Sequence, residues 1–255
     1  MNIAVFSGAG MSAESGLKTF RDNNGLWEEY NVYEVATPEA WGKNPKLVLE
    51  FYNQRRRQLL DAKPNPAHIL LADLEKEHQV NIITQNIDDL HERSGSTDVL
   101  HLHGELRKSQ SSKYPNLVYE IPNWELKIGD VCEKGFQLRP NVVWFGEPVP
   151  MMYTAEKIVA GCDLLIVIGT SLNVYPAAGL LHSVSSNTPI YVIDPADIDI
   201  SAYKNCRHIQ KSASDGLKKL IHDLEFNTLW GKEYILLYIC SLKEGTLVPS
   251  FSKSI

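Results

Sequence analysis

The sequence predicts an α/β protein built on a doubly wound parallel sheet. Four short apolar runs typical of buried strands, at residues 3–6, 80–84, 164–168 and 190–193, alternate with helix-like stretches. A glycine-rich turn follows the first run directly. Because strands that are apolar along their whole length suit a sheet covered on both faces, we expect a Rossmann-like large domain with ligands at the carboxyl ends of its strands.

The first run leads into a turn of small residues that includes Gly8, Ala9, Gly10 and Ala13. A strand followed by a helix start offers backbone N–H groups and the positive end of the helix dipole, which suit a pyrophosphate. Glycine would let the backbone approach such a ligand closely. This Gly-x-Gly-x-x-Ala pattern also fits a generic dinucleotide fingerprint, and tight turns made only for packing share it.

Residues 45–61 and 66–77 are predicted helices that open with proline, and a further helix is expected over 215–224. On the first helix, Tyr52 and Arg55 lie at i and i+3 on a face that is otherwise apolar. An arginine on a buried face needs an anionic partner. The alternative is that residues 55–57 form a solvated charge run with Tyr52 at the edge of the core.

Polar side chains follow the second run. Gln85, Asn86 and Asp88 offer amide and carboxylate groups that can hold a ribose or a carboxamide, although turn chemistry alone would also favour them. His101 and His103 are two residues apart, so in an extended segment both point the same way. Asn86, Asp88 and His103 all fall just after strand-like runs and are candidates for chemistry at one edge of the sheet. We interpret His101 as structural.

Three further candidate sites lie in later apolar runs or directly after them. Residues 142–147 are predicted to form a strand whose backbone could pair with a peptide, or an ordinary core strand. Gly169, Thr170 and Ser171 offer a second cradle for a phosphate or a ribose. Asp194 ends the last run, where an acidic group could hold the adenosine ribose of a dinucleotide.

The domain organisation follows from the stretches that break the strand–helix alternation. Residues 22–65 and 107–141 are expected to build a smaller inserted module. The large domain would comprise residues 1–21, 66–106 and 142–225, and residues 226–255 would be an unassigned tail. The tail carries an apolar run at 234–240 through which chains could associate, and otherwise we expect a monomer.

Composition excludes several classes of protein. With 255 residues, a net charge of −6 and a pI near 5.8, the chain lacks the basic footprint of a nucleic-acid-binding protein. Its apolar runs are far shorter than the roughly 20 residues of a membrane span, and it starts in a strand rather than a signal peptide. The four cysteines are scattered, which favours reduced thiols. We expect a cytoplasmic protein with no membrane or nucleic-acid partner.

Five motifs together resemble the sirtuin family of NAD-dependent protein-lysine deacylases, in order and in spacing. They are GAGMSAESG with TFRD after it, TQNIDDLH at 84–91, HLHGEL at 101–106, VVWFGE at 142–147 and GTSLNVYPAAG at 169–179. The resemblance covers about residues 1–225.

The resemblance implies NAD as the cofactor and acyl-lysine proteins as substrates. The acyl group would pass to ADP-ribose, with nicotinamide and free lysine released. His103 would be the base, Asn86 and Asp88 would shape the nicotinamide pocket, and Gln85 would contact ribose. The motifs add Phe20 and Arg21 to the cofactor-binding residues. The residues that bind the substrate peptide would be Val142, Phe145, Gly146 and Glu147.

The pair Tyr52-x-x-Arg55, together with Ala36, resembles the sirtuin subgroup that removes succinyl and malonyl groups. The small Ala36 would leave room for the longer acyl chain, so we expect a desuccinylase and demalonylase with deacetylase activity. The alternatives are a non-catalytic NAD or ADP-ribose sensor and a mono-ADP-ribosyltransferase. A hydride-transferring dehydrogenase is disfavoured, because no second strand–helix unit ending in an acidic residue follows the first turn.

One departure from the family concerns zinc. Most sirtuins fold the insert around a zinc held by two Cys-x-x-Cys pairs, whereas here those places are taken by Ser109, Ser112, Cys132 and Gly135. Four nitrogen or sulfur ligands cannot be assembled locally, so we expect no metal. Apolar residues between 114 and 128 could form a small core instead, namely Tyr114, Leu117, Val118, Tyr119, Ile121, Trp124, Leu126 and Ile128.

Overall fold

The computed structural model describes residues 1–18, 30–172 and 175–224. It divides into a unit of residues 1–216 and a second unit of residues 217–255, in which the described residues 217–224 are helical. Phe20, Arg21 and the tail at 226–255 lie outside the described residues. Among the helices that are described, none combines the length and the apolar character needed to cross a membrane.

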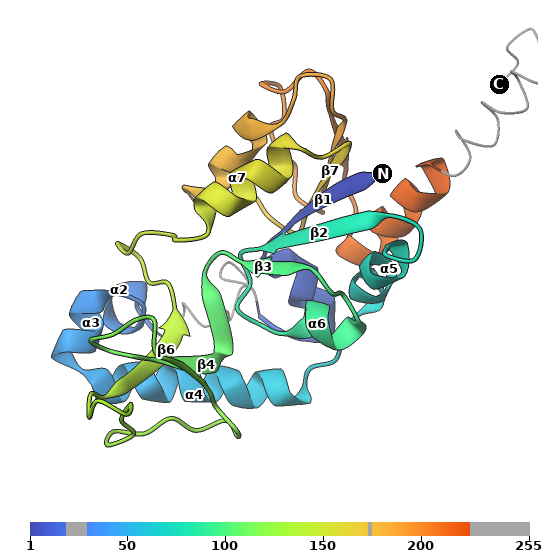
Figure 1. Ribbon diagram of the computed structural model, residues 1–255. Coiled ribbons are helices and arrows are strands. Elements are labelled where there is room, and N and C mark those ends of the chain that lie inside the picture. Colours follow the sequence, from blue (N-terminus) through green and yellow to red (C-terminus); the bar gives the residue numbers. More distant parts are fainter. Residues whose placement is uncertain (19–29, 173–174, 225–255) are drawn as a thin grey trace, which may run out of the picture. The chain divides into compact units, whose positions relative to one another are not determined.

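A six-stranded parallel sheet forms the centre of the first unit, in the order β3-β2-β1-β7-β8-β9 (Figure 1). Its strands are β1 (Asn2–Ser7), β2 (Gln79–Thr84), β3 (Val99–His101), β7 (Leu164–Ile168), β8 (Ile190–Ile193) and β9 (Cys206–Ile209). The four strands predicted from apolar runs are confirmed. The two edge strands β3 and β9 are largely half-exposed and therefore lack a continuous apolar run.

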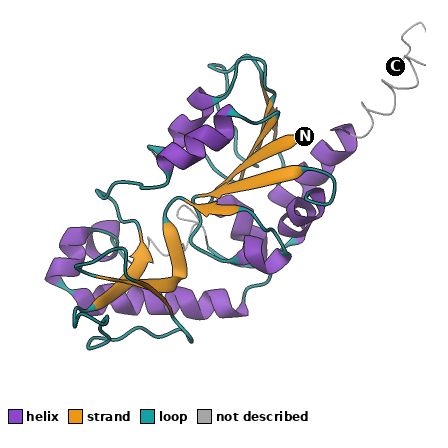
Figure 2. Ribbon diagram, viewed as in Figure 1, coloured by secondary structure: helices purple, strands orange, loops and turns teal. Residues whose placement is uncertain are grey.

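Helices cover both faces of this sheet, which confirms the doubly wound α/β fold (Figure 2). Alternate residues of β1, β7 and β8 face α7 and η2 in one apolar cluster. The intervening residues, such as Val5 and Ile166, are equally buried on the other face. The helices are η1 (Ala9–Ser15), α5 (Pro66–Leu74), α6 (Leu90–Ser94), α7 (Met152–Ala160) and η2 (Ala177–Ser183).

The sheet order places a topological switch point at the end of β1. The chain pairs β1 with β2 on one side and with β7 on the other. In open α/β sheets, the crevice outside the carboxyl ends of such strands is the usual ligand site. The turns that follow β1, β2 and β7 carry the sequence-predicted site residues.

A second, three-stranded antiparallel sheet lies against α4 (Figure 1). It has the order β5-β4-β6, with strands β4 (Gly104–Ser111), β5 (Val118–Glu120) and β6 (Leu138–Val142). The chain before residue 66 adds α2 (Val32–Val35), α3 (Pro38–Lys43) and α4 (Pro45–Asp61). Both parts share an apolar core that includes Val35, Phe51, Leu106 and Trp144. The division into a large domain and an inserted module stays a prediction.

Local hydrogen bonds explain two differences from the expected elements. The predicted strand at 142–147 is wrong, because β6 ends at Val142 and the chain then turns. The N–H of Trp144 donates to Glu147 Oε2 at 2.8 Å, which removes a donor that strand pairing would need. Gly146 adopts a positive φ of 90° in the same turn. The predicted helix at 66–77 ends earlier, at Leu74.

The arginines at 55–57 are not one solvated run. Arg56 is fully buried, and its guanidinium donates to Trp124 O at 2.7 Å, Leu106 O at 3.3 Å and Asn53 Oδ1. Arg57 is exposed and lies 3.5 Å from the centre of the Trp124 ring. No signal in the sequence singles out Arg56 as the buried member.

The predicted small core of the insert makes an apolar contact with α4. Ile121 and Leu126 are buried against Leu49 of α4. Val118 and Ile128, which we also assigned to this core, are 43% and 56% exposed, so that part of the prediction is wrong. The small core is therefore shared with α4 rather than contained within the insert.

We expect the purified protein to contain well under one zinc per chain. The insert at 107–141 offers Cys132 as its one soft ligand, and the Cys132 thiol donates to Ser111 Oγ at 3.3 Å. Among the described residues, no group of three or more His, Cys, Asp or Glu side chains is placed to hold a metal. Atomic emission spectroscopy measures the content. Stoichiometric zinc whose removal by a chelator unfolds the protein would contradict this expectation.

Candidate active site

The turns after β1 and β7 pack directly against each other. The N–H of Gly8 donates to Ile168 O at 3.0 Å, and the N–H of Gly10 donates to Gly169 O at 2.8 Å. A Cβ atom on Gly10 would lie 2.8 Å from Gly169 Cα, and one on Gly169 would lie 2.1 Å from Met11 N. We expected Gly8 and Gly10 to let the backbone approach a ligand closely, but the close approach seen here is between two segments of the chain itself.

Asn86, Asp88 and Ser12 form a buried polar cluster at the switch point. Asn86 Nδ2 donates to Gly8 O and to Ser12 Oγ, both at 3.1 Å. The Ser12 hydroxyl donates to Asp88 Oδ2 at 3.0 Å. Burial raises the pKa of Asp88, while the hydrogen bonds from Ser12 and Leu90 oppose that rise. Ser12 was missed as a site residue, although it lies within the first motif.

His103 is held in one tautomer by the loop after β2. Its Nδ1 lies 3.0 Å from Gln85 O, and since a carbonyl can only accept, Nδ1 carries the proton and donates. Burial lowers the pKa of His103, so the ring is neutral near pH 7 and Nε2 keeps a lone pair. This is the state that a general base requires.

Gln85 and Thr170 connect two of the turns, because the Thr170 hydroxyl donates to Gln85 Oε1 at 3.1 Å. Ser171 follows directly and is partly exposed. Asp194 lies at the carboxyl end of β8, where its Oδ1 accepts the N–H of Ala196 at 2.9 Å. The carboxylate of Asp194 thus stabilises its own turn.

Tyr52 and Ala36 meet the turn at residues 143–147 from a distant part of the sequence. The indole N–H of Trp144 donates to the Tyr52 hydroxyl at 3.0 Å, and the N–H of Phe145 donates to Ala36 O at 3.1 Å. Tyr52 and Ala36 are both buried. Burial raises the pKa of Tyr52 to about 12, so its phenol keeps a proton to donate at neutral pH.

Arg55 is one turn further along α4. Burial lowers the pKa of Arg55, and the nearby groups that oppose this shift are Tyr52 and Asp88. The guanidinium is thus electrostatically coupled both to the Tyr52 region and to the carboxylate at the switch point. A cation in such a partly desolvated position favours an anionic ligand.

Two of the residues assigned to substrate peptide binding have structural partners. Both oxygens of Glu147 accept from Arg139, at 2.7 and 3.0 Å, and the Arg139 guanidinium lies 3.4 Å from the centre of the Trp144 ring. Val142 O accepts from Arg139 at 2.8 Å. Arg139 was missed by the sequence analysis. Val142 and Glu147 also line a cleft of about 620 Å³, whose other lining residues include His101 and Gly104.

Phe145 and Gly146 occupy the turn itself. Phe145 is 54% exposed as a residue, an unusual degree for a large apolar residue beside a buried cluster. Gly146 has open space where a Cβ atom would be. Both residues are therefore accessible to a ligand, and neither is engaged in an ion pair as Glu147 is.

Comparisons with known proteins agree with these motifs. The chain is 51% identical over 224 residues to an NAD-dependent protein deacylase of Bacteroides thetaiotaomicron, covering 86% of this chain and 96% of that protein. It is 53% identical over 225 residues to one of Helicobacter pylori, covering 88% and 97%.

Solved structures show the same fold. A Sir2 homologue mutant in complex with ADP-ribose superposes with a TM-score of 0.81 at 36% identity, covering 89% of this chain and 92% of that one. A Sir2 homologue complex with NAD gives a TM-score of 0.78 at 38% identity, covering 88% and 89%. The model of the Sir2 family matches residues 8–176. The chain thus belongs to the Sir2 family, which confirms the resemblance to sirtuins.

Proposed function

We propose that this chain is an NAD-dependent protein deacylase that prefers lysines carrying an acidic acyl group, such as succinyl or malonyl, and also accepts acetyl-lysine. The deacylase activity is supported by relatives of that name at about half identity and by a neutral His103 that is bonded to Gln85 O in the loop that carries Asn86 and Asp88. The acyl preference is carried by one observation: a buried phenol and a partly desolvated guanidinium lie one turn apart on α4.

The residues at the switch point fit NAD. The turn at Gly8, Ala9, Gly10 and Ala13 would take the pyrophosphate, and Asn86 with Asp88 offers the amide and carboxylate groups that suit a carboxamide. Gln85 and the stretch Gly169, Thr170 and Ser171 would hold ribose hydroxyls, and Asp194 the adenosine ribose. The fit rests on the chemistry of these groups and on the buried Ser12–Asn86–Asp88 cluster, which brings them to one edge.

In the proposed reaction His103 acts as the base. NAD, when bound, would supply the electrophilic sugar carbon for the acyl oxygen and nicotinamide as the leaving group. The Nδ1 bond from His103 to Gln85 O fixes the ring orientation and leaves Nε2 to take a proton from a ribose hydroxyl. Ser12 holds Asn86 and Asp88 in position, so that the site is organised before the substrate arrives.

In the proposed acyl pocket, each of three residues has a separate role. Tyr52 receives the Trp144 indole N–H, which leaves its own hydroxyl proton to donate to a distal carboxylate. Arg55 supplies the opposite charge. Ala36, whose side chain ends at Cβ, leaves length for a four-carbon acyl chain. Phe145 and Gly146 would flank the peptide, with Val142 and Glu147 behind them.

The test is mass spectrometry of NAD and a succinyl-lysine peptide after incubation with the protein. We expect free lysine, nicotinamide and an acylated ADP-ribose in equal amounts. Unchanged NAD and peptide, in spite of tight NAD binding, would instead identify a sensor. ADP-ribose attached to protein would identify a mono-ADP-ribosyltransferase.

A further inference from the structure

The loop that carries Asn86 is held from one side by a single segment of the chain. Four successive carbonyls, those of residues 84–87, each accept a hydrogen bond from residues 101–106. The donors are Leu102 N to Thr84 O at 2.9 Å, His103 Nδ1 to Gln85 O at 3.0 Å, His101 Nδ1 to Asn86 O at 3.0 Å and Leu106 N to Ile87 O at 2.7 Å. Two of the four donors are imidazole rings.

His101 differs from His103 in having an acceptor on both ring nitrogens. Its Nδ1 faces Asn86 O at 3.0 Å, and its Nε2 lies 2.7 Å from Glu92 Oε1 on α6. A carbonyl and an ionised carboxylate can only accept, so both ring nitrogens must donate and the ring is an imidazolium. The His101 side chain is 8% exposed, which makes an unpaired charge there costly and the pairing with Glu92 necessary.

We propose that His101 and Glu92 form a positioning pair, in which the imidazolium of His101 clamps the Asn86 carbonyl and thereby orients the Asn86 and Asp88 side chains for catalysis. This rests on the deacylase function proposed above. It also replaces our interpretation of His101 as a purely structural residue, because the ring acts on the loop that carries two proposed catalytic residues.

The charged groups around His101 are consistent with this pairing. Glu92 and Glu105 both raise the pKa of His101, against the effect of burial. Lys108 Nζ lies 2.8 Å from Glu105 Oε1, so the charge of Glu105 is partly neutralised. Glu92 therefore remains the main ionic partner of His101. His101 in turn opposes the rise that burial causes in the pKa of Asp88, and it adds to the lowering that burial causes in the pKa of His91. Loss of the imidazolium would therefore also disfavour the Asp88 carboxylate.

The pH window of the pair follows from these directions. The pKa of His101 is raised, so the stability that its charge adds to the folded loop is present at lower pH. That stability is lost as pH rises through the raised pKa. The pKa of Glu92 is lowered, so the stability that its carboxylate adds is lost only as pH falls through this lowered pKa. His103 must be neutral to act as a base, so activity should also fall at acid pH as His103 becomes protonated. Deacylation should therefore follow a bell-shaped profile whose alkaline limb reports His101.

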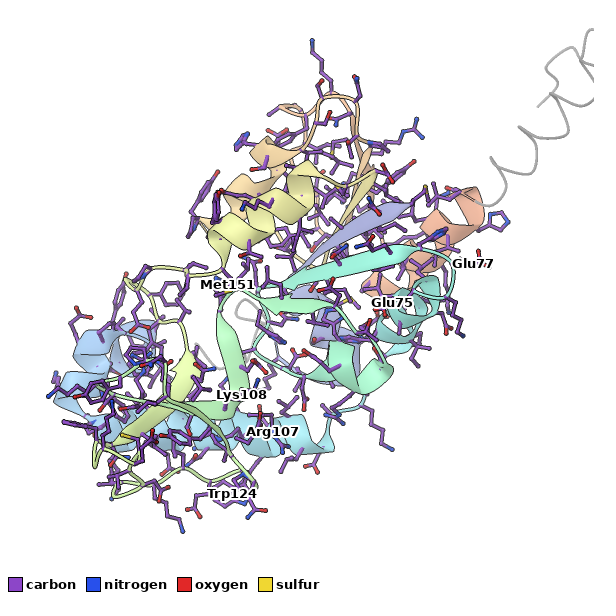
Figure 3. All side chains as sticks on the ribbon, viewed as in Figure 1. Glu75, Glu77, Arg107, Lys108, Trp124 and Met151 are labelled. Carbon is purple, nitrogen blue, oxygen red and sulfur yellow. The ribbon has the colours of Figure 1, made fainter. Side chains whose placement is uncertain are left out.

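The experiment is the pH dependence of kcat/KM for NAD in Glu92→Gln, with Glu77→Gln as the matched control. Glu77 is exposed, lies beyond the end of α5 and is labelled well to the right of Lys108 in Figure 3. Removing the Glu92 charge should move the alkaline limb to lower pH by about one unit or more. The control should leave the limb in place. The phenylalanine of His101→Phe has no ring nitrogens, so this variant should be less active at every pH. Its pH profile should also lack the alkaline limb.

An NMR titration of the ligand-free protein provides a readout that does not depend on activity. Glu92→Gln should lower the pKa of the His101 ring, and the Asn86 amide signals should titrate together with that ring in both proteins. A pKa of His101 that does not fall would overturn the imidazolium assignment. If that pKa falls while the Asn86 signals or the alkaline limb do not follow, the positioning role is wrong. Wild type that binds NAD but deacylates no peptide rejects the proposed function, and the NMR result then decides the clamp separately.

Discussion

Replacing His103 with alanine should nearly abolish deacylation and leave NAD binding largely intact. Removal of a general base typically costs about 10²- to 10⁴-fold in rate. The structure shows a neutral ring whose Nδ1 is committed to Gln85 O, so Nε2 is the group that becomes unavailable. Product formation is measured by mass spectrometry and NAD affinity by calorimetry, with the two readouts taken on the same preparation.

His182→Ala is the matched control, since this exposed histidine contacts Tyr203 and lies outside the proposed catalytic residues. It should retain wild-type activity. In wild type, activity should fall as pH drops through the lowered pKa of His103, because the base becomes protonated there. A His103→Ala variant that keeps more than about half of the activity would show that another group takes the proton.

The central sheet could be predicted because burial on both faces leaves a direct trace in the sequence. Strands such as β7 are apolar at every position and form short runs bounded by turn residues. The site residues then follow from topology, since side chains after β1, β2 and β7 must meet at the carboxyl edge. The edge strands β3 and β9 have no continuous apolar run, because their residues are largely half-exposed.

What could not be predicted depends on contacts between distant segments. Arg55, Arg56 and Arg57 are identical in type, and only the packing of α4 against residues 106 and 124 makes Arg56 the buried one. The apolar run at 142–147 has the composition of a strand. It turns instead because Glu147 satisfies the Trp144 N–H. A period-two pattern carries no information about such a side-chain bond.

Replacing Arg55 with methionine should cut desuccinylation by at least about tenfold and reduce deacetylation far less. A hydrogen bond to a charged group is worth about 1.5 to 3 kcal/mol, or roughly 10- to 150-fold in discrimination. The variant would leave the distal carboxylate of a succinyl group unpaired in a partly desolvated pocket, whereas an acetyl group has no such charge to lose. The measurement is kcat/KM for two peptides that differ only in the acyl group.

Arg57→Met is the matched control on the same helix, because Arg57 is exposed and contacts the Trp124 ring rather than the Tyr52 region. It should leave the ratio of the two rates unchanged. Tyr52→Phe removes the donor while keeping the ring in the core, and it should shift the ratio in the same direction as Arg55→Met. If both substrates decline in parallel in the Arg55 variant, the guanidinium supports α4 through its coupling to Asp88, and the pocket has no preference for acidic acyl groups.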